Sequence, residues 1–263
     1  MIGVMIRETR RSTLSVMIAL LAILAGSMSA HAAKNLTNEK IIRNFNLIAF
    51  GNEYTLKRYK QVRKWSGPIR IGIQGKNHPP YFEAYVRQQI RDLWDITRHP
   101  IELYYSFAMQ KTGQLAKDFD AKKVNFILFY LPVAEIPKAV AKYFDNDEAK
   151  VKQMIKVSTC FAKYFTRKNE IVSAIAVFPS HNSRKTMRAC VVEETTQVMG
   201  LANDSTEVNP SIFNDKSPYT ELTEHDRWML RMFYDPRIKA NMEREEALAM
   251  GRKILDEIRP EGQ

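Results

Sequence analysis

Hydrophobic and polar residues alternate along this chain with two distinct periods. Apolar residues return every three or four positions over residues 38–50 and 81–97, a spacing typical of a helix that buries one face. Over residues 69–73 apolar residues alternate with other types, as they do in a half-buried strand. By the same criteria we predict further strands at 101–105, 125–131, 160–165 and 171–178, and further helices at 134–144, 147–155, 183–201, 223–233 and 244–258.

The order of these segments predicts the fold class. A strand, a helix and a second strand follow one another between residues 69 and 105, which favours a mixed sheet with a helix laid across it. The run 125–131 is almost continuously apolar, so we expect a strand covered on both faces. We therefore predict an α+β protein in which residues 33–263 form a single domain.

The helix at 183–201 is the segment around which the other predictions are arranged. Its apolar residues fall close to helical spacing on one face, while three polar residues, Glu193, Glu194 and Gln197, project elsewhere. Glu193 and Gln197 are one turn apart and share a side of the helix. Gly200 stands where a helix commonly stops in a left-handed residue.

The chain is expected to bend just beyond this helix. Asn203 and Asp204 are residues that favour turns, and the loop at 203–218 is rich in Asn, Asp, Ser and Pro. We expect this loop to cover a cleft. The candidate cleft residues are Glu193, Glu194, Gln197, Asn203 and Asp204.

The first 32 residues have the composition of an export signal. A basic opening, an apolar run of about a dozen residues and the small-residue site Ala30-His31-Ala32 predict a signal peptide cleaved after Ala32. The apolar run is shorter than the about 20 residues of a membrane-spanning helix, and we expect no such helix in the mature chain. The predicted location is periplasmic or secreted, by general secretion or, because of the pair Arg10-Arg11, by the twin-arginine route.

Cys160 and Cys190 are the two cysteines of the chain, and export would place both in an oxidising compartment. We predict a disulfide between them, worth about 3 to 4 kcal/mol on the chain-entropy model for a loop of about 30 residues. Two free thiols or a shared metal ion are the alternatives, although no histidine stands at ligand spacing. His181, in the turn before the central helix, is expected to be solvated.

The basic composition bears on the choice of partner. The formal net charge is +11, and removal of residues 1–32 takes away three basic residues and one acidic residue, which leaves +9. Such a charge favours anionic envelope components, such as phospholipid headgroups, lipopolysaccharide or wall polymers, over nucleic acid. A basic surface that only confers solubility is the alternative.

The central helix resembles the metal-binding helix of the zincin metallopeptidases. Those enzymes carry H-E-x-x-H, which the metzincin branch extends to H-E-x-x-H-x-x-G-x-x-H, followed by a turn with a methionine. On this template Glu193 and Gln197 take the two helical ligand places and Glu194 the general-base place. Gly200 takes the glycine place and Asn203 the third-ligand place.

Two further segments extend this resemblance. Residues 211–214, S-I-F-N, resemble the methionine turn with Phe213 in place of the methionine, and the strand at 171–178 stands where zincins form the rim of the cleft. The resemblance implies a zincin-like mixed sheet with a motif helix and C-terminal helices. It also implies structural roles for Gly200, Ser211, Phe213 and Asn214.

The metal ligands of the zincin pattern are missing. Amide oxygens are weak zinc ligands, so Glu193 is the only good donor among the three ligand places. We therefore predict no bound metal and no cofactor, with Glu194 as the one candidate catalytic residue. Alternatively, Glu194 is a structural residue that forms an ion pair with Arg184 or Arg188, which explains its presence equally well.

A second resemblance covers nearly the whole mature chain. The segments C-x-x-E-E-x-T-Q, S-I-F-N and Tyr-Asp-Pro stand at residues 190–197, 211–214 and 234–236. With them the chain resembles an uncharacterised family of exported bacterial proteins known as a domain of unknown function, DUF 2927. That family brings no established activity with it.

Two functional hypotheses from different classes follow. The first is a binding or scaffold protein on a zincin-like fold, a pseudoenzyme whose cleft holds a peptide or an anionic envelope component. The second is an atypical hydrolase or peptidase in which Glu194 acts as general base, with a weakly bound metal or none. The sequence leaves undecided whether the protein is an enzyme.

Overall fold

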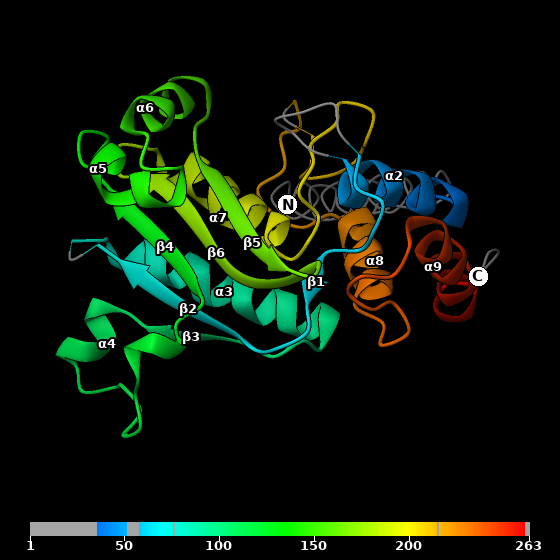
Figure 1. Cartoon of the computed structure of the whole chain (residues 1–263), viewed down its shortest axis with the longest axis horizontal. Coiled ribbons are helices and arrows are strands. Elements are labelled where there is room, and N and C mark those ends of the chain that lie inside the picture. Colours follow the sequence, from blue (N-terminus) through cyan, green and yellow to red (C-terminus); the bar gives the residue numbers. More distant parts are fainter. Residues whose placement is uncertain (1–35, 52–57, 76, 215, 261–263) are drawn as a thin grey trace, which may run out of the picture.

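The computed structural model describes residues 36–51, 58–75, 77–214 and 216–260, and within them six strands form one sheet (Figure 1). The strand order is β1-β6-β4-β2-β3, with β5 paired to β6. Neighbours along the main path run parallel, whereas β5 runs antiparallel to β6. The strands are β1 (Lys64–Trp65), β2 (Ile69–Gln74), β3 (Ile101–Tyr105), β4 (Phe126–Leu131), β5 (Phe161–Arg167) and β6 (Glu170–Pro179).

Helices cover both faces of this mixed sheet and extend the molecule beyond one end of it (Figure 1). The longer ones are α2 (Asn38–Phe50), α3 (Pro80–Thr97), α6 (Glu148–Val157), α7 (Arg184–Gln197), α8 (Glu224–Phe233) and α9 (Arg244–Ile258), and the short ones are α4 (Phe107–Lys111) and α5 (Ile136–Val140). Helices α2, α8 and α9 pack on one another beside the sheet. The α+β class with a mixed sheet is therefore confirmed.

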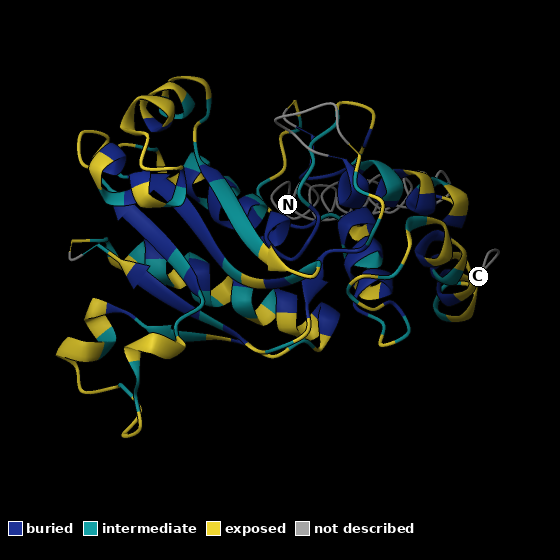
Figure 2. Cartoon of the chain, in the orientation of Figure 1, coloured by how far each residue is buried: buried dark blue, intermediate teal, exposed yellow. Residues whose placement is uncertain are grey.

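The central strands are buried on both faces because their residues are apolar at nearly every position. Along β6, Ala174, Ala176 and Phe178 belong to the main core on the side of α3 and α7. The intervening Ile175 and Val177 belong to a second core under α5 and α6. Figure 2 shows β4 and β6 as the most continuously buried elements of the sheet. The expectation of a doubly covered strand at 125–131 is confirmed.

Several predicted elements have different bounds in the structure. The helix predicted at 183–201 ends at Gln197, and the segment predicted as one helix at 134–144 consists of α5 and a short 3-10 turn. The hairpin between β5 and β6 turns on Lys168 and Asn169 alone, both with positive φ. Strand β1 was not predicted, because two residues carry no periodic signal.

The prediction that strand 171–178 forms the rim of the cleft is wrong. Strand β6 pairs with β4 on one edge and with β5 on the other, so it lies inside the sheet. Among the described residues β5 pairs with β6 alone, and β5 is therefore the edge strand on this side.

The predicted signal peptide at 1–32 lies outside the described residues. Within the described part of the chain, no helix combines the length and apolar character needed to cross a membrane.

Candidate functional site

Helix α7 carries the polar residues on which the sequence analysis centred. Ser183 caps its start by accepting a hydrogen bond from the Thr186 amide, 3.2 Å away. Near its end Thr196 is buried and donates to the Val192 carbonyl, while the Gln89 side chain of α3 donates to the Thr196 hydroxyl at 3.0 Å. The helix is thus fixed against α3 by polar as well as apolar contacts.

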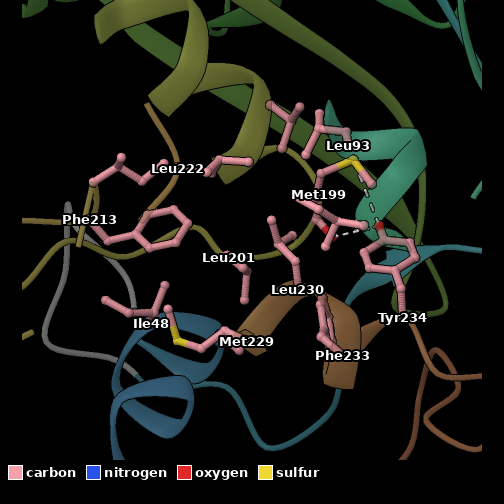
Figure 3. Close-up of a cluster of buried hydrophobic side chains, with 14 of the residues drawn as sticks. Ile48, Leu93, Met199, Leu201, Phe213, Leu222, Met229, Leu230, Phe233 and Tyr234 are labelled. Carbon is pink, nitrogen blue, oxygen red and sulfur yellow. Dashed lines mark hydrogen bonds between the residues drawn. The ribbon is translucent and has the colours of Figure 1, made fainter. Parts of the chain in front are cut away.

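The C-terminal end of α7 is held by two aromatic donors. The last carbonyls of a helix have no partner within it. The Trp65 indole donates to the Val198 carbonyl at 2.8 Å. The Tyr234 hydroxyl donates to the Met199 carbonyl, also at 2.8 Å (Figure 3). Tyr234 belongs to the Tyr-Asp-Pro segment, and this segment therefore supports the C-terminal end of α7.

Gly200 is required by its conformation and by its surroundings. Its φ is +109°, a value that side chains rarely allow. A Cβ added there would lie 2.2 Å from the Arg63 carbonyl oxygen. The predicted left-handed stop thus agrees with the observed positive φ, three residues after the helix ends.

The structure brings four of the predicted cleft residues to one hollow of about 430 Å³, which we call the acidic hollow. Glu193, Glu194, Gln197 and Asp204 line it, together with Asn214 and the disulfide of Cys160 and Cys190. The Gln197 amide nitrogen is 3.0 Å from each carboxylate oxygen of Asp204. This pair fixes the start of the loop against the helix.

The predicted disulfide between Cys160 and Cys190 is present and joins the residue before β5 to α7. It therefore fixes the edge strand beside the motif helix. The two basic residues considered as partners of Glu194 have other contacts: Arg188 pairs with Glu221, and the Arg184 guanidinium lies 4.9 Å from the Tyr81 ring centroid.

Asn203, predicted to take the third-ligand place and to line the cleft, is not among the residues that line the acidic hollow. Its amide nitrogen donates to the Leu47 carbonyl at 3.1 Å, and its backbone N–H donates to the Ile48 carbonyl. A Cβ on Gly51 would come within 2.5 Å of its side chain. Asn203 therefore ties the chain after α7 to the end of α2, whereas the next residue, Asp204, faces the hollow.

The S-I-F-N segment is held by a buried carboxylate on α8. Asp226 accepts hydrogen bonds from the Ser211 hydroxyl at 2.6 Å and from the Ile212 N–H at 3.1 Å. It also accepts from the N–H and the hydroxyl of Thr223, the N-cap residue of α8. Burial raises the pKa of Asp226, and these four donors oppose that rise. We call this set of contacts the Asp226 clamp.

The other residues of this segment are structural as well. Phe213 is fully buried, and in Figure 3 its ring lies near Ile48 and Met229. The Asn214 amide donates to the carbonyls of Thr206 and Val208, which closes the loop on itself. Phe213 thus takes an apolar packing role at the place where the template has methionine.

A second hollow has a volume of about 470 Å³, and Gln197 lines both it and the acidic hollow. We call it the cationic hollow, because Arg63, Lys150 and Lys163 line it. Tyr59, Ala162 and Tyr164 are also among its walls. The sequence analysis assigned no role to these residues, although Arg63 belongs to the densest basic group of the chain, at 57–64.

The backbone of β5 has hydrogen-bonding groups that face away from β6. The Ala174 N–H donates to the Asn125 carbonyl, on the β4 side of β6. Backbone groups in a strand alternate between its two edges, so the neighbours Ser173 and Ile175 direct theirs to β5.

The register then fixes the outer edge of β5. Ile175 is opposite Lys163 and Ser173 is opposite Phe165, so these are the hydrogen-bonded pairs. Ala162 and Tyr164 consequently direct their N–H and C=O groups outward, at the cationic hollow. In the described part of the chain these groups have no hydrogen-bond partner, so another extended chain can pair with them.

The described residues hold no group of three or more His, Cys, Asp or Glu side chains arranged to bind a metal ion. His181 is exposed in the turn after β6, and among the described residues the acidic hollow is lined by carboxylate, amide and hydroxyl groups but by no imidazole. These donors do not match the histidine-rich set that zinc prefers.

The fold and the site define an α+β protein whose edge strand lines a cationic hollow and whose central helix lines both this hollow and an acidic one. A model of the family described as a protein of unknown function, DUF2927, matches residues 38–253, and the chain belongs to this family. No curated protein and no solved structure matches the chain.

Proposed function

We propose that this protein is an exported peptide-binding protein on a zincin-like fold, in which the metallopeptidase chemistry has been lost. The observation that carries the proposal is the outer edge of β5. Ala162 and Tyr164 direct backbone donors and acceptors away from β6, on the side of the cationic hollow, and an extended peptide can pair with them as an added strand. Main-chain hydrogen bonds would supply affinity and the two hollows would supply selectivity.

The relation of β5 to α7 supports the zincin-like part of the proposal. The resemblance implies a strand at the rim of a cleft whose floor is the motif helix. The disulfide joins Cys160, directly before β5, to Cys190 of α7, and both cysteines line the acidic hollow, so the start of β5 is held beside this helix. The replacement of the imidazole ligands by a carboxylate and amides supports the loss of metal-dependent chemistry.

The oxidised cysteine pair supports export, since disulfides form and persist in oxidising compartments. A periplasmic or secreted protein with a basic surface would meet extended segments of envelope proteins there. We propose such segments as the physiological ligands.

The test uses a pool of randomised octapeptides, acetylated and amidated at their ends, passed over the immobilised purified protein. We expect retention of a subset of peptides and slower hydrogen exchange of the β5 amides in their presence. The Ala162→Pro variant removes one outward N–H but no hydrogen bond to β6, and proline is tolerated on edge strands. It should lower retention about tenfold or more, as expected for a lost ladder hydrogen bond and added steric bulk.

Ala162→Val is the matched control, because it adds bulk at the same residue but keeps the N–H. Equal retention by the wild type and both variants would exclude pairing along β5. The hydrolase alternative has its own readout: cleavage of retained peptides that disappears in Glu194→Gln would replace the binding function by catalysis. We expect intact peptides, and retention unchanged by a chelator.

A further inference from the structure

The cationic hollow contains a buried arginine that has no acidic partner among the described residues. The Arg63 side chain is almost wholly buried, and in the described part of the chain no carboxylate lies within ion-pair distance of it. One terminal nitrogen donates to the Ala49 carbonyl at 3.2 Å, while Nε is buried and makes no hydrogen bond to any residue that the structure describes. Burial lowers the pKa of this guanidinium, which shows how costly its charge is there.

Two tyrosines surround this guanidinium. Its carbon lies 3.0 Å from the Tyr59 ring centroid and 5.2 Å from that of Tyr164. These rings stabilise the cation by cation–π attraction, but they carry no negative charge to neutralise it. The site is therefore stabilised in its positive form without being neutralised.

The Tyr164 hydroxyl is a second group that has no partner among the residues described. It is buried and makes no hydrogen bond to any described residue. Burial raises the pKa of Tyr164, so the hydroxyl keeps its proton and can donate it. An unsatisfied buried donor costs free energy that a ligand oxygen would recover.

Two lysines add positive charge at the mouth of the hollow. Lys163 donates to the Tyr143 carbonyl at 2.6 Å, and Lys150 lies 3.5 Å from Asp145. The Asp145 side chain is 86% exposed, so water weakens its compensation of these charges. The net field in the hollow therefore favours an anion.

We propose that the cationic hollow binds a carboxylate of the peptide that pairs with β5, with Arg63 and the Tyr164 hydroxyl as its donors. The inference rests on the proposed function. The outward backbone groups of Ala162 and Tyr164 border the same hollow, so a paired peptide would present a side chain or its end there. The carboxylate is either the C-terminal group or an Asp or Glu side chain.

The experiment compares four octapeptide pools on the immobilised protein. Each has either a free or an amidated C-terminus, and its randomised positions either include or omit Asp and Glu. If the terminal carboxylate is the ligand, both free-acid pools should be retained about tenfold more than the amidated ones, the scale of a charge-assisted pair. If side chains supply it, only the pools with Asp and Glu should be enriched.

Tyr164→Phe is the main variant, because it removes a hydroxyl without a protein partner and keeps the backbone of β5. It should reduce the preference for carboxylates about three- to tenfold and leave retention of the carboxylate-free pool unchanged. Arg63→Gln should abolish the preference, and its melting temperature shows whether it is folded. Tyr105→Phe, on β3 and outside the lining of both hollows, is the matched control and should behave as the wild type.

The two proposals fail in different ways. Equal retention of all four pools, with loss in Ala162→Pro, would overturn the carboxylate site and leave peptide binding intact. Retention of none would overturn peptide binding, and this inference with it. A carboxylate preference that persists in both Tyr164→Phe and Arg63→Gln would also overturn the assignment to this hollow.

Discussion

The Asp226 clamp and the acidic hollow are both polar clusters beside the same loop, but they differ in where their polar groups point. In the clamp, four donors of the chain converge on one buried carboxylate. In the acidic hollow, Glu193, Glu194 and Asp204 border a cavity of about 430 Å³. The first arrangement stabilises the fold, and only the second leaves space for a ligand.

The clamp should show the largest effect on stability. Asp226→Ala removes the acceptor of four hydrogen bonds and leaves buried donors unsatisfied, which should cost about 3 to 5 kcal/mol. Urea unfolding at pH 7 measures the change. Glu193→Ala in the acidic hollow is the comparison, and a similar loss in both variants would remove the distinction between the two clusters.

The disulfide connects the acidic hollow to the edge strand, and its removal should have the next largest effect. Replacing Cys160 and Cys190 together by Ala should lower the free energy of unfolding by about 3 to 4 kcal/mol, because the unfolded chain gains freedom. Thermal unfolding with and without a reductant gives the same comparison for the wild type. A change below about 1 kcal/mol would mean that the packing of β5 on α7 suffices alone.

Next to the clamp, His225 should make stability depend on pH. Burial lowers its pKa to about 4, and its ring nitrogen is 3.1 Å from the Asn44 amide. Between this value and the unfolded pKa of about 6.5 the unfolded chain binds more protons, so stability falls as the pH falls.

For the wild type, the free energy of unfolding should fall by about 2 kcal/mol from pH 7 to pH 5 because of His225. In His225→Gln the residue does not titrate, and the pH dependence should be smaller by that amount. Urea unfolding at the two pH values measures both proteins. If stability depends on pH equally in both proteins, the pKa of His225 is not lowered by folding.

The smallest effect on stability is expected in the acidic hollow. Glu193 is half-buried, and Glu193→Gln conserves its shape, so the free energy of unfolding should change by less than about 1 kcal/mol. The profile of retained peptides should nevertheless shift away from basic residues, as read by mass spectrometry. An unchanged profile combined with a large loss of stability would make Glu193 a structural residue like Asp226.

Much of the fold was predictable because the periodic pattern is strong in long elements. The predicted bounds of α2, β3 and α9 agree with the structure. The end of α7 was placed four residues too far, because Val198, Met199 and Leu201 continue the helical spacing after the backbone has left the helix. The sequence pattern reports which side chains are buried, not which backbone conformation buries them.

The site was only half predictable. The four predicted residues of the acidic hollow, Glu193, Glu194, Gln197 and Asp204, lie close together in the chain, on one helix and the turn after it, so one motif revealed them. Even there the zincin template, aligned without gaps, placed Asn203 in the third-ligand position. Such an alignment cannot tell which of the adjacent turn residues, Asn203 or Asp204, faces the acidic hollow. The cationic hollow combines residues of β5 and α6 with Arg63, which lies before β1, and only the folded sheet brings them together.

The contact between Gly200 and the Arg63 carbonyl has a consequence for variation within the family. A side chain at residue 200 would displace the backbone that carries Arg63, and with it the guanidinium at the bottom of the cationic hollow. Relatives that lack this glycine are therefore expected to differ at the arginine too. A glycine after the end of α7 would in this way control the ligand preference of a neighbouring hollow that it does not itself line.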